Sequence, residues 1–225
     1  MRRLVVLRPE PGASATVERA RAMGLDAYTM PLFAVELVAW DAPEPSDFDA
    51  LLLTSANAAR HGGTGLEWLR SLPVYAVGEA TADAAREAGF EVAGEGDGGV
   101  ERLLGSIPSE VRLLHLCGEH RTDFFAKQVI ATVSVYRSLE LPPPDELREI
   151  EGQVAAVHSP RGGQRLAELV DQAGIDRATI RIAAISKAAA SAAGDGWAIS
   201  EAAEVPNEVA LLALAARLCD NCVTT

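Results

Sequence analysis

Cysteine is scarce in this 225-residue chain, and long hydrophobic runs are missing. Three cysteines (Cys117, Cys219 and Cys222) are too few and too unevenly spaced for a disulfide framework. The last two form a lone CxxC in what we expect to be a frayed C-terminal tail. No segment approaches the roughly 18 uninterrupted apolar residues of a membrane span, and no signal-peptide core follows Arg2-Arg3. We therefore expect a cytoplasmic protein that does not enter the membrane.

Basic residues are also in short supply. The chain has 20 Lys and Arg against 32 Asp and Glu, a net charge of -12, which argues against a nucleic-acid partner because phosphate binding needs a basic face. Neither a GxGxxG fingerprint nor a Walker loop is present, and the glycine-rich segment 94–99 is acidic, which predicts a surface loop and no nucleotide cofactor. His115, Cys117 and His120 are close in sequence but have no second ligand group at matching spacing, so we expect no metal.

The chain contains repeated sequence segments. An apolar run, a small or hydroxyl-bearing loop and a helix start follow one another several times, a pattern typical of strand-loop-helix units. Three pairs of segments match: 49–60 with 152–163, 73–83 with 181–191, and 3–10 with 112–119. In the first pair Ser159 stands where Ser55 stands. The repetition predicts two α/β domains of similar build.

The order of the repeats predicts how the chain is divided. The partner of the N-terminal unit lies near residue 112, whereas the partners of residues 49–92 lie after residue 150, so the duplication is permuted. Residues 1–35 would join residues 140–225 in one discontinuous domain, and residues 40–131 would form the other. Two extended, β-rich segments, 30–40 and 132–140, would cross between them as a two-stranded β linker. We expect each domain to be a doubly wound parallel sheet.

Several strand-to-helix loops are rich in small residues, which leaves backbone N–H groups exposed. These loops are 54–57, 78–81, 117–119 and 159–162. Amides at helix starts can hold carboxylates even in an acidic protein, because they act at contact range while the net charge acts through screened water. Each loop taken alone is better explained by ordinary N-cap residues. Their convergence at the carboxyl ends of parallel strands favours a ligand site.

The motifs together resemble one family. Leu52-Leu-Thr-Ser-Ala-Asn-Ala58, Ala76-Val-Gly-Glu-Ala-Thr-Ala82, Cys117-Gly-Glu-His-Arg121, Val133-Ser-Val-Tyr-Arg137 and His158-Ser-Pro-Arg161 are similar, in this order and over nearly the whole chain, to uroporphyrinogen-III synthases. The resemblance implies two α/β domains with a substrate cleft between them. It also implies a cyclising lyase of tetrapyrrole biosynthesis that closes hydroxymethylbilane with inversion of ring D, without metal or cofactor.

The resemblance also suggests site residues. Tyr136 matches the family tyrosine credited with assisting departure of the substrate hydroxyl; the alternative is a linker aromatic that packs the two strands together. The expected substrate-binding residues are Arg8, Thr54, Ser55, Ala56, Asn57, Gly78, Thr81, Cys117, Gly118, Ser159, Arg161, Ser186 and Lys187. Segment 185–190 lacks the glycine and both hydroxyls that the family often has there, although Lys187 could contact a carboxylate instead.

A second class of function stays open at this point. A two-lobed small-molecule-binding or regulatory protein derived from the same fold would have the same sequence features without catalytic activity. For the enzyme, the expected partner is the linear tetrapyrrole hydroxymethylbilane, an eight-fold carboxylate. We expect a monomer that makes at most transient contact with hydroxymethylbilane synthase.

Overall fold

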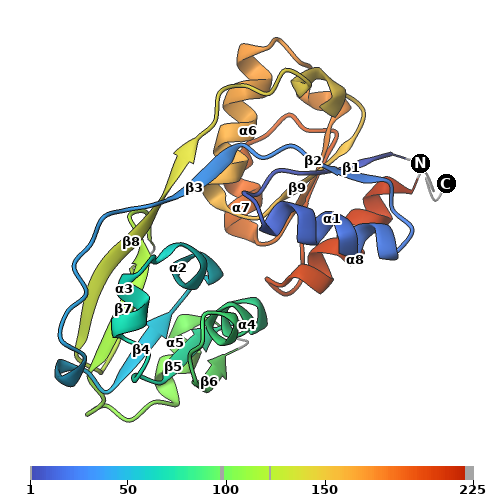
Figure 1. Cartoon of the computed structure of the whole chain (residues 1–225). Helices are drawn as coiled ribbons and strands as arrows, with labels where there is room; N and C mark the ends of the chain where they lie inside the picture. The colour runs from blue at the N-terminus through green and yellow to red at the C-terminus, as the bar shows by residue number, and fades with distance from the viewer. Residues whose placement is uncertain (1, 97–98, 122, 221–225) are drawn as a thin grey trace. The chain divides into compact units, whose positions relative to one another are not determined.

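The computed structural model describes residues 2–96, 99–121 and 123–220. Its contacts divide the chain into two compact units, unit 1 (residues 1–34 and 140–225) and unit 2 (residues 35–139). The elements of each unit are labelled in Figure 1. Both units are built from a mainly parallel sheet with helices on its two faces, so the predicted α/β fold class is confirmed.

The sheet of unit 1 has five parallel strands in the order β11-β10-β9-β1-β2. The strands are β1 (Leu4–Val6), β2 (Ala27–Thr29), β9 (Val154–Val157), β10 (Arg181–Ala184) and β11 (Ile199–Ala202). Counted along the chain this is the 2-1-3-4-5 order of flavodoxin-like sheets. The two central strands, β1 and β9, are buried along their whole length, which explains why they are continuous apolar runs in the sequence.

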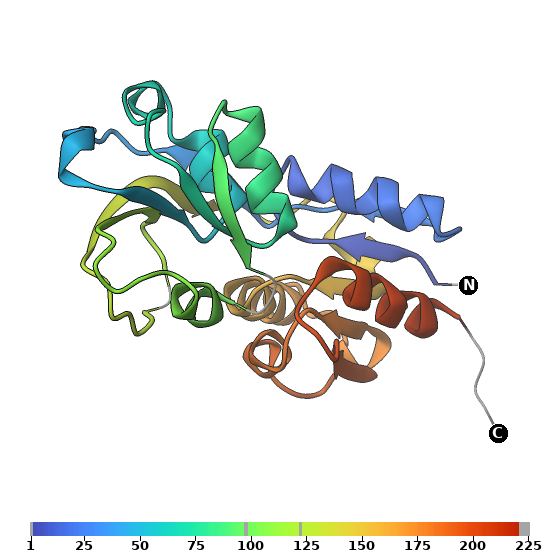
Figure 2. The same ribbon diagram turned by 90° about the horizontal axis from the view of Figure 1, so that it is seen from below.

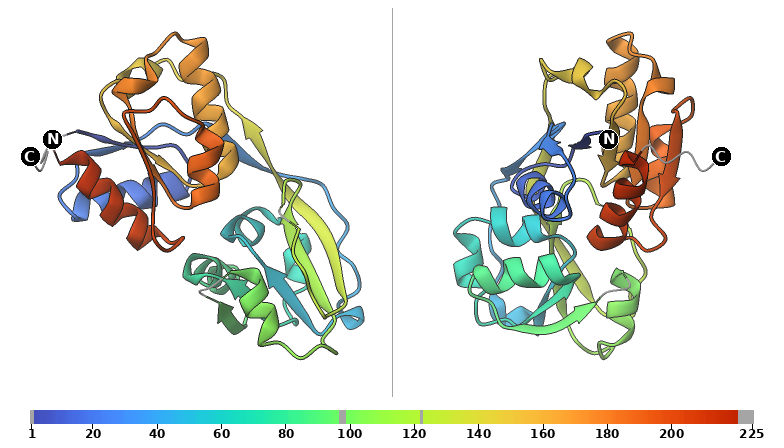
Figure 3. Two further views of the ribbon diagram at one scale, coloured as in Figure 1. Left: turned by 180° about the vertical axis from the view of Figure 1, so that it is seen from behind. Right: turned by 90° about the vertical axis from the view of Figure 1, so that its right-hand side faces the viewer.

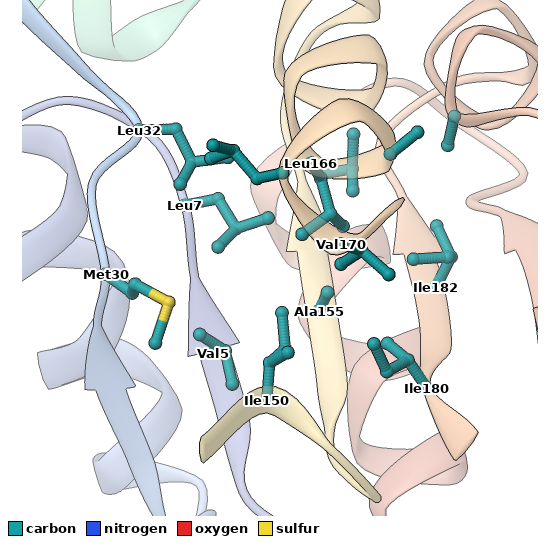
Figure 4. Close-up of a cluster of buried hydrophobic side chains, with 14 of the residues drawn as sticks. Val5, Leu7, Met30, Leu32, Ile150, Ala155, Leu166, Val170, Ile180 and Ile182 are labelled. Carbon is teal, nitrogen blue, oxygen red and sulfur yellow. The ribbon is translucent and has the colours of Figure 1, made fainter. Parts of the chain in front are cut away.

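Helices cover both faces of this sheet. On one face lie α1 (Gly12–Ala22) and α8 (Glu208–Cys219), and on the other α6 (Pro160–Gln172) and α7 (Lys187–Ala193); Figure 2 shows α1 running along β1. Two short 3-10 helices, η2 (Leu147–Ile150) and η3 (Arg177–Thr179), complete the unit. Helix α6 buries a stripe at helical spacing that includes Leu166 and Val170, and Figure 4 shows both among the strand residues Val5, Ala155 and Ile182.

The sheet of unit 2 has six strands in the order β3-β8-β7-β4-β5-β6. They are β3 (Phe33–Leu37), β4 (Ala50–Leu53), β5 (Val74–Val77), β6 (Val92–Gly96), β7 (Leu113–Gly118) and β8 (Ile130–Glu140). From β8 to β6 the pairing is parallel. Strand β3 runs antiparallel to β8, since Val38 N–H donates to Val135 O while Leu141 N–H donates to Leu32 O. Figure 3 shows these two strands side by side.

The helices of unit 2 also lie on two faces. Helices α2 (Ala56–His61), α3 (Gly65–Trp68) and α4 (Glu79–Glu87) pack on one face of the sheet, and α5 (Val100–Gly105) packs on the other. The 3-10 helix η1 (Pro45–Asp47) precedes β4. Central strands β4 and β7 are buried along their whole length, like β9 and β1 of unit 1.

The strand orders of the two units correspond one to one. When both sheets are listed from the same edge, the five strands of unit 1 match five strands of unit 2. The matching pairs are β11/β6, β10/β5, β9/β4, β1/β7 and β2/β8. The pairs β9/β4, β10/β5 and β1/β7 are those that carry the repeated sequence segments. In chain order the β1-type strand comes first in unit 1 but follows the β9-type strand in unit 2, as expected for a permuted duplication.

The segments predicted as linkers differ in structure. All of segment 132–140 belongs to β8, which pairs with β7 and so extends the sheet of unit 2. In segment 30–40 only Phe33–Leu37 is a strand, and Met30, Leu32 and Phe33 are buried in the core of unit 1. The division between the units falls within β3 and near the end of β8.

Three local predictions are corrected by the structure. Cys117 and Gly118 do not directly precede a helix: both belong to β7, and the described residues between β7 and β8, 119–121 and 123–129, contain no helix. This connection is held by the buried Gln128, whose Nε2 donates to Leu104 O and Ile107 O at 2.9 and 2.7 Å.

The glycine-rich segment expected as a surface loop begins inside a strand, since residues 94–96 belong to β6. Cys219 is the buried last residue of α8 and is not part of a frayed tail, while Cys222 lies outside the described residues. Among the helices that the structure describes, none has the length and apolar character needed to cross a membrane.

Candidate functional site

The predicted site residues gather at the carboxyl edges of the two sheets. In a doubly wound sheet, ligands bind outside the carboxyl ends of the strands at the point where the strand order reverses. In unit 1 this point lies between β1 and β9, and in unit 2 the corresponding strands are β7 and β4.

In unit 1, serine hydroxyls cap the two helices that begin at this edge. Ser159 Oγ accepts from Gly162 N–H at the start of α6, and Ser186 Oγ accepts from Ala189 N–H at the start of α7. The Arg161 guanidinium lies 4.8 Å over the Phe33 ring, and Lys187 is exposed as the first residue of α7. The N-cap explanation of both serines therefore holds.

A cluster of charged and polar groups surrounds Arg8, which follows β1. Arg8 Nη1 donates to Glu208 Oε2 at 3.2 Å, and the same carboxylate accepts from Thr16 Oγ1 at 2.5 Å. It lies 3.7 Å from Arg19 Nη1 and 3.5 Å from His158 Nε2. Four elements, β1, α1, β9 and α8, thus meet at one carboxylate.

The protonation states in this cluster follow from burial and from the neighbouring groups. Burial lowers the pKa of His158, so the ring is neutral at pH 7. Burial raises the pKa of Glu208, but the contact with the His158 ring, the hydrogen bond from Thr16 and the charge of Arg8 outweigh it and bring the pKa to about 2. With Arg8 and Arg19 charged, these five side chains carry one net positive charge.

In unit 2, the β4 edge carries the loop of residues 54–57. Ser55 Oγ accepts from Asn57 N–H and caps α2, in the same extended conformation as Ser159. Ala56 and Asn57 begin that helix. Gly78 precedes α4 at φ 85°, a backbone conformation that favours glycine, and Thr81 is only 5% exposed.

Tyr136 belongs to β8. It lies beside the carboxyl end of β7, where its backbone is in register with Gly118. Its ring packs directly on this glycine, because a Cβ at position 118 would lie 2.8 Å from Cε2 and Cζ of the tyrosine. Burial raises the pKa of Tyr136, while a hydrogen bond with the Ser55 side chain acts in the opposite direction. The phenol is therefore protonated at neutral pH and can donate a hydrogen bond.

Cys117 and His115, on the neighbouring strand β7, are both buried. Cys117 is 2% exposed, its Sγ lies 3.6 Å from Val133 O, and burial raises the pKa of its thiol. His115 Nε2 lies 3.0 Å from Thr54 Oγ1, and burial, with a smaller contribution from Arg121, lowers its pKa to about 4. His115 is thus neutral at pH 7 and fixes the Thr54 hydroxyl at the end of β4.

Sequence reasoning missed five of these residues. His115, His158, Thr16, Arg19 and Glu208 were not expected near a site. His158 is the first residue of the motif His158-Ser-Pro-Arg161, and His115 was weighed only as a metal ligand, so both had a sequence signal. Thr16, Arg19 and Glu208 have no local motif. In the part of the chain that the structure describes, no three His, Cys, Asp or Glu side chains come together as a metal-ligand set.

Comparison with known families identifies this arrangement. The family model described as "Uroporphyrinogen-III synthase HemD" matches residues 14–213. The chain belongs to the uroporphyrinogen-III synthase family. It is therefore a cyclising lyase of tetrapyrrole biosynthesis, which converts hydroxymethylbilane into uroporphyrinogen III, and the alternative of a non-catalytic regulator is not favoured.

Solved structures of this family share the fold. Uroporphyrinogen-III synthetase from Helicobacter pylori superposes with a TM-score of 0.63 at 18% identity, covering 97% of this chain and 100% of that one. A mutant uroporphyrinogen-III synthase from Thermus thermophilus gives a TM-score of 0.51 at 18% identity, covering 97% of each chain. At this level of identity the likeness shows the fold, while the family model shows the family.

Proposed function

We propose that the carboxyl edges of both sheets hold the acetate and propionate groups of hydroxymethylbilane, and that Tyr136 assists departure of its hydroxyl group. The amides at the starts of α2, α6 and α7, together with Arg8, Arg161 and Lys187, suit a substrate with eight carboxylates. In this proposal Thr54, Asn57, Gly78 and Ser186 contribute through their backbone or hydroxyl groups.

The role of Tyr136 rests on one observation, the placement of a protonated phenol at the carboxyl end of β7 against Gly118 and Ser55. As the C–O bond of the hydroxymethyl group breaks, electrons from the pyrrole nitrogen form the azafulvene and this nitrogen loses its proton to solvent. The leaving oxygen takes up one proton, so that the net loss from the substrate is one water. A phenol that donates a hydrogen bond to this oxygen stabilises the charge that develops on it.

Geometry must supply most of the selectivity. The azafulvene carbon is strongly electrophilic and pyrrole carbons are nucleophilic, so uncatalysed closure proceeds directly to the type I isomer. Inversion requires attack through the substituted carbon of ring D, which gives a spiro intermediate that fragments and recloses. Contacts with many carboxylates can hold the chain in the folded conformation that this attack needs.

The decisive experiment compares Tyr136→Phe with Tyr75→Phe. Tyr75 lies on β5 of the same sheet but packs on the α5 face, whereas Tyr136 packs on the opposite face, so the control removes a hydroxyl group from the other side of the sheet. Freshly made hydroxymethylbilane is supplied, and chromatography after oxidation separates the isomers. We expect Tyr136→Phe to keep the type III product but to slow its formation by roughly tenfold to a few hundredfold, the lower part of the range for general acid catalysis. Tyr75→Phe should retain the parental rate.

A fully active Tyr136→Phe would remove the tyrosine from the mechanism, and type I product alone from the parent would overturn the function. Thr81→Ala should slow the reaction less than Tyr136→Phe, because Thr81 is buried in the first turn of α4. We further propose that the enzyme acts as a cytoplasmic monomer and receives its substrate through transient contact with hydroxymethylbilane synthase.

A further inference from the structure

Arg8 lies against two features that fix the place of its guanidinium. The first is Gly12, the first residue of α1: a Cβ at this position would lie 2.7 Å from Arg8 Nε and 3.0 Å from Cζ. The side chain can therefore take this position only because residue 12 has no side chain. The second feature is Glu208, at the start of α8, which accepts a hydrogen bond from Arg8 Nη1 at 3.2 Å.

Glu208 is itself held firmly. Thr16 donates to one of its oxygens at 2.5 Å, and the buried His158 ring lies 3.5 Å from the other. The carboxylate side chain is 21% exposed, against 34% for Arg8. The guanidinium is thus the more exposed partner of the pair, at the carboxyl end of β1 where the strand order of unit 1 reverses.

The charge of the cluster has a sign that suits an anionic ligand. One carboxylate faces two guanidinium groups, because Arg19 Nη1 lies 3.7 Å from the same Glu208, and His158 is neutral. A local excess of one positive charge acts at short range even though the whole chain carries -12. A guanidinium also binds carboxylates in a fixed, planar geometry, so its orientation determines the strength of the contact.

We propose that Gly12 and Glu208 are positioning residues that hold the Arg8 guanidinium for one carboxylate of the substrate. This inference rests on the proposed function, in which Arg8 belongs to the substrate-binding edge of unit 1. Glu208 orients the guanidinium through its hydrogen bond, and Gly12 leaves the space in which the Arg8 side chain lies.

The experiment measures KM and kcat for uroporphyrinogen III formation in Arg8→Ala, Glu208→Gln and Gly12→Ala. Gly12→Ala removes no charge, and the atoms it displaces belong to the flexible end of a side chain, so the variant should fold. Two controls carry the same substitutions elsewhere. Glu201→Gln removes the partner of the exposed Arg217, and Gly105→Ala adds a Cβ that meets no atom within 4 Å. Urea unfolding of each variant measures its stability.

Arg8→Ala, Glu208→Gln and Gly12→Ala should each raise KM by roughly tenfold, the expected effect of losing a hydrogen bond to a charged group, with kcat within about twofold of the parent. Both controls should retain the parental KM. When Glu208→Gln or Gly12→Ala is combined with Arg8→Ala, KM should rise by less than about twofold beyond Arg8→Ala alone, because the guanidinium through which both residues act is already gone.

Parental KM in Gly12→Ala would overturn the inference. It would also be overturned if Gly12→Ala or Glu208→Gln raised KM as much in the Arg8→Ala background as it does in the parent. If Glu208→Gln does not fold, the test relies on the KM of Gly12→Ala and of the double variant Gly12→Ala/Arg8→Ala. Failure of the proposed function looks different, since the parent would then make only the type I isomer. Parental KM in Arg8→Ala, with type III product still formed, would refute substrate binding by Arg8 and the inference with it.

Discussion

Substituting Gly118 by alanine should displace Tyr136 without removing its hydroxyl group. The new Cβ would lie 2.8 Å from Cε2 and Cζ of the ring and 3.1 Å from its hydroxyl oxygen. Non-bonded carbons pack at roughly 3.5 to 4.0 Å, so the ring must retreat by about 1 Å. Its hydrogen bond with Ser55 would be lost or reoriented by a movement of this size.

The expected loss of rate follows from this displacement. A misplacement of about 1 Å can slow an enzyme by about a hundredfold. Gly118→Ala should therefore lose nearly as much rate as Tyr136→Phe although the phenol is still present. Overpacking a buried strand position should also lower the free energy of unfolding by about 1–3 kcal/mol.

Initial rates of type III product, corrected for spontaneous type I closure, provide the assay, and Gly94→Ala provides a matched control. A Cβ at position 94 would lie 2.7 Å from Cδ1 of Tyr75, the same kind of contact in the same sheet. We expect the control to lose similar stability in urea but to retain its rate. The reasoning is refuted if Gly118→Ala is fully active, or if both variants slow equally. In a Tyr136→Phe background, Gly118→Ala should slow the reaction little further.

Two further predictions concern stability. Because the folded-state pKa of His115 is about 4, below the 6.5 of the unfolded chain, the unfolded state binds more protons between these pH values. Stability should fall as pH falls from 6.5 to 4, and His115→Gln should flatten this dependence in urea unfolding. Gly163→Ala should lower the free energy of unfolding by about 1–3 kcal/mol, because its Cβ would lie 2.7 Å from the backbone oxygen of Ala189. Gly162→Ala should be nearly neutral in thermal unfolding, because its Cβ meets only the Ser159 hydroxyl, at 3.2 Å.

The sequence allowed the fold to be predicted because its strongest signals are local. Central parallel strands such as β4 and β9 are buried on both faces and therefore appear as short apolar runs. The serine that follows each of these strands caps the next helix, so Ser55 and Ser159 occupy equivalent places in the two units. Repeats of this kind also predict which strands of the two units are equivalent, and the structure places each repeated segment at the same position of its sheet.

The site was less predictable, because its key contacts join distant segments. Glu208 reaches Arg8 across 200 positions of sequence, and no pattern near either residue indicates the pair. Likewise His115 was considered in the sequence only as a metal ligand and set aside, and its contact with Thr54 arises because β4 and β7 are neighbours in the sheet. The importance of Gly12 and Gly118 depends on which side chain lies over each glycine, and this is settled only by tertiary packing.

The two units carry different side chains at the point where the strand order of each sheet reverses. The edge of unit 1 gathers two arginines around one carboxylate, an arrangement that favours an anion. The edge of unit 2 gathers hydroxyl groups and a neutral histidine, and its phenol stays protonated at neutral pH. A cationic edge suits carboxylate binding, and an edge with a phenol donor suits assistance to a departing hydroxyl. Within unit 2, burial raises the pKa of Tyr136 and so keeps the phenol in the protonated form that can donate a hydrogen bond.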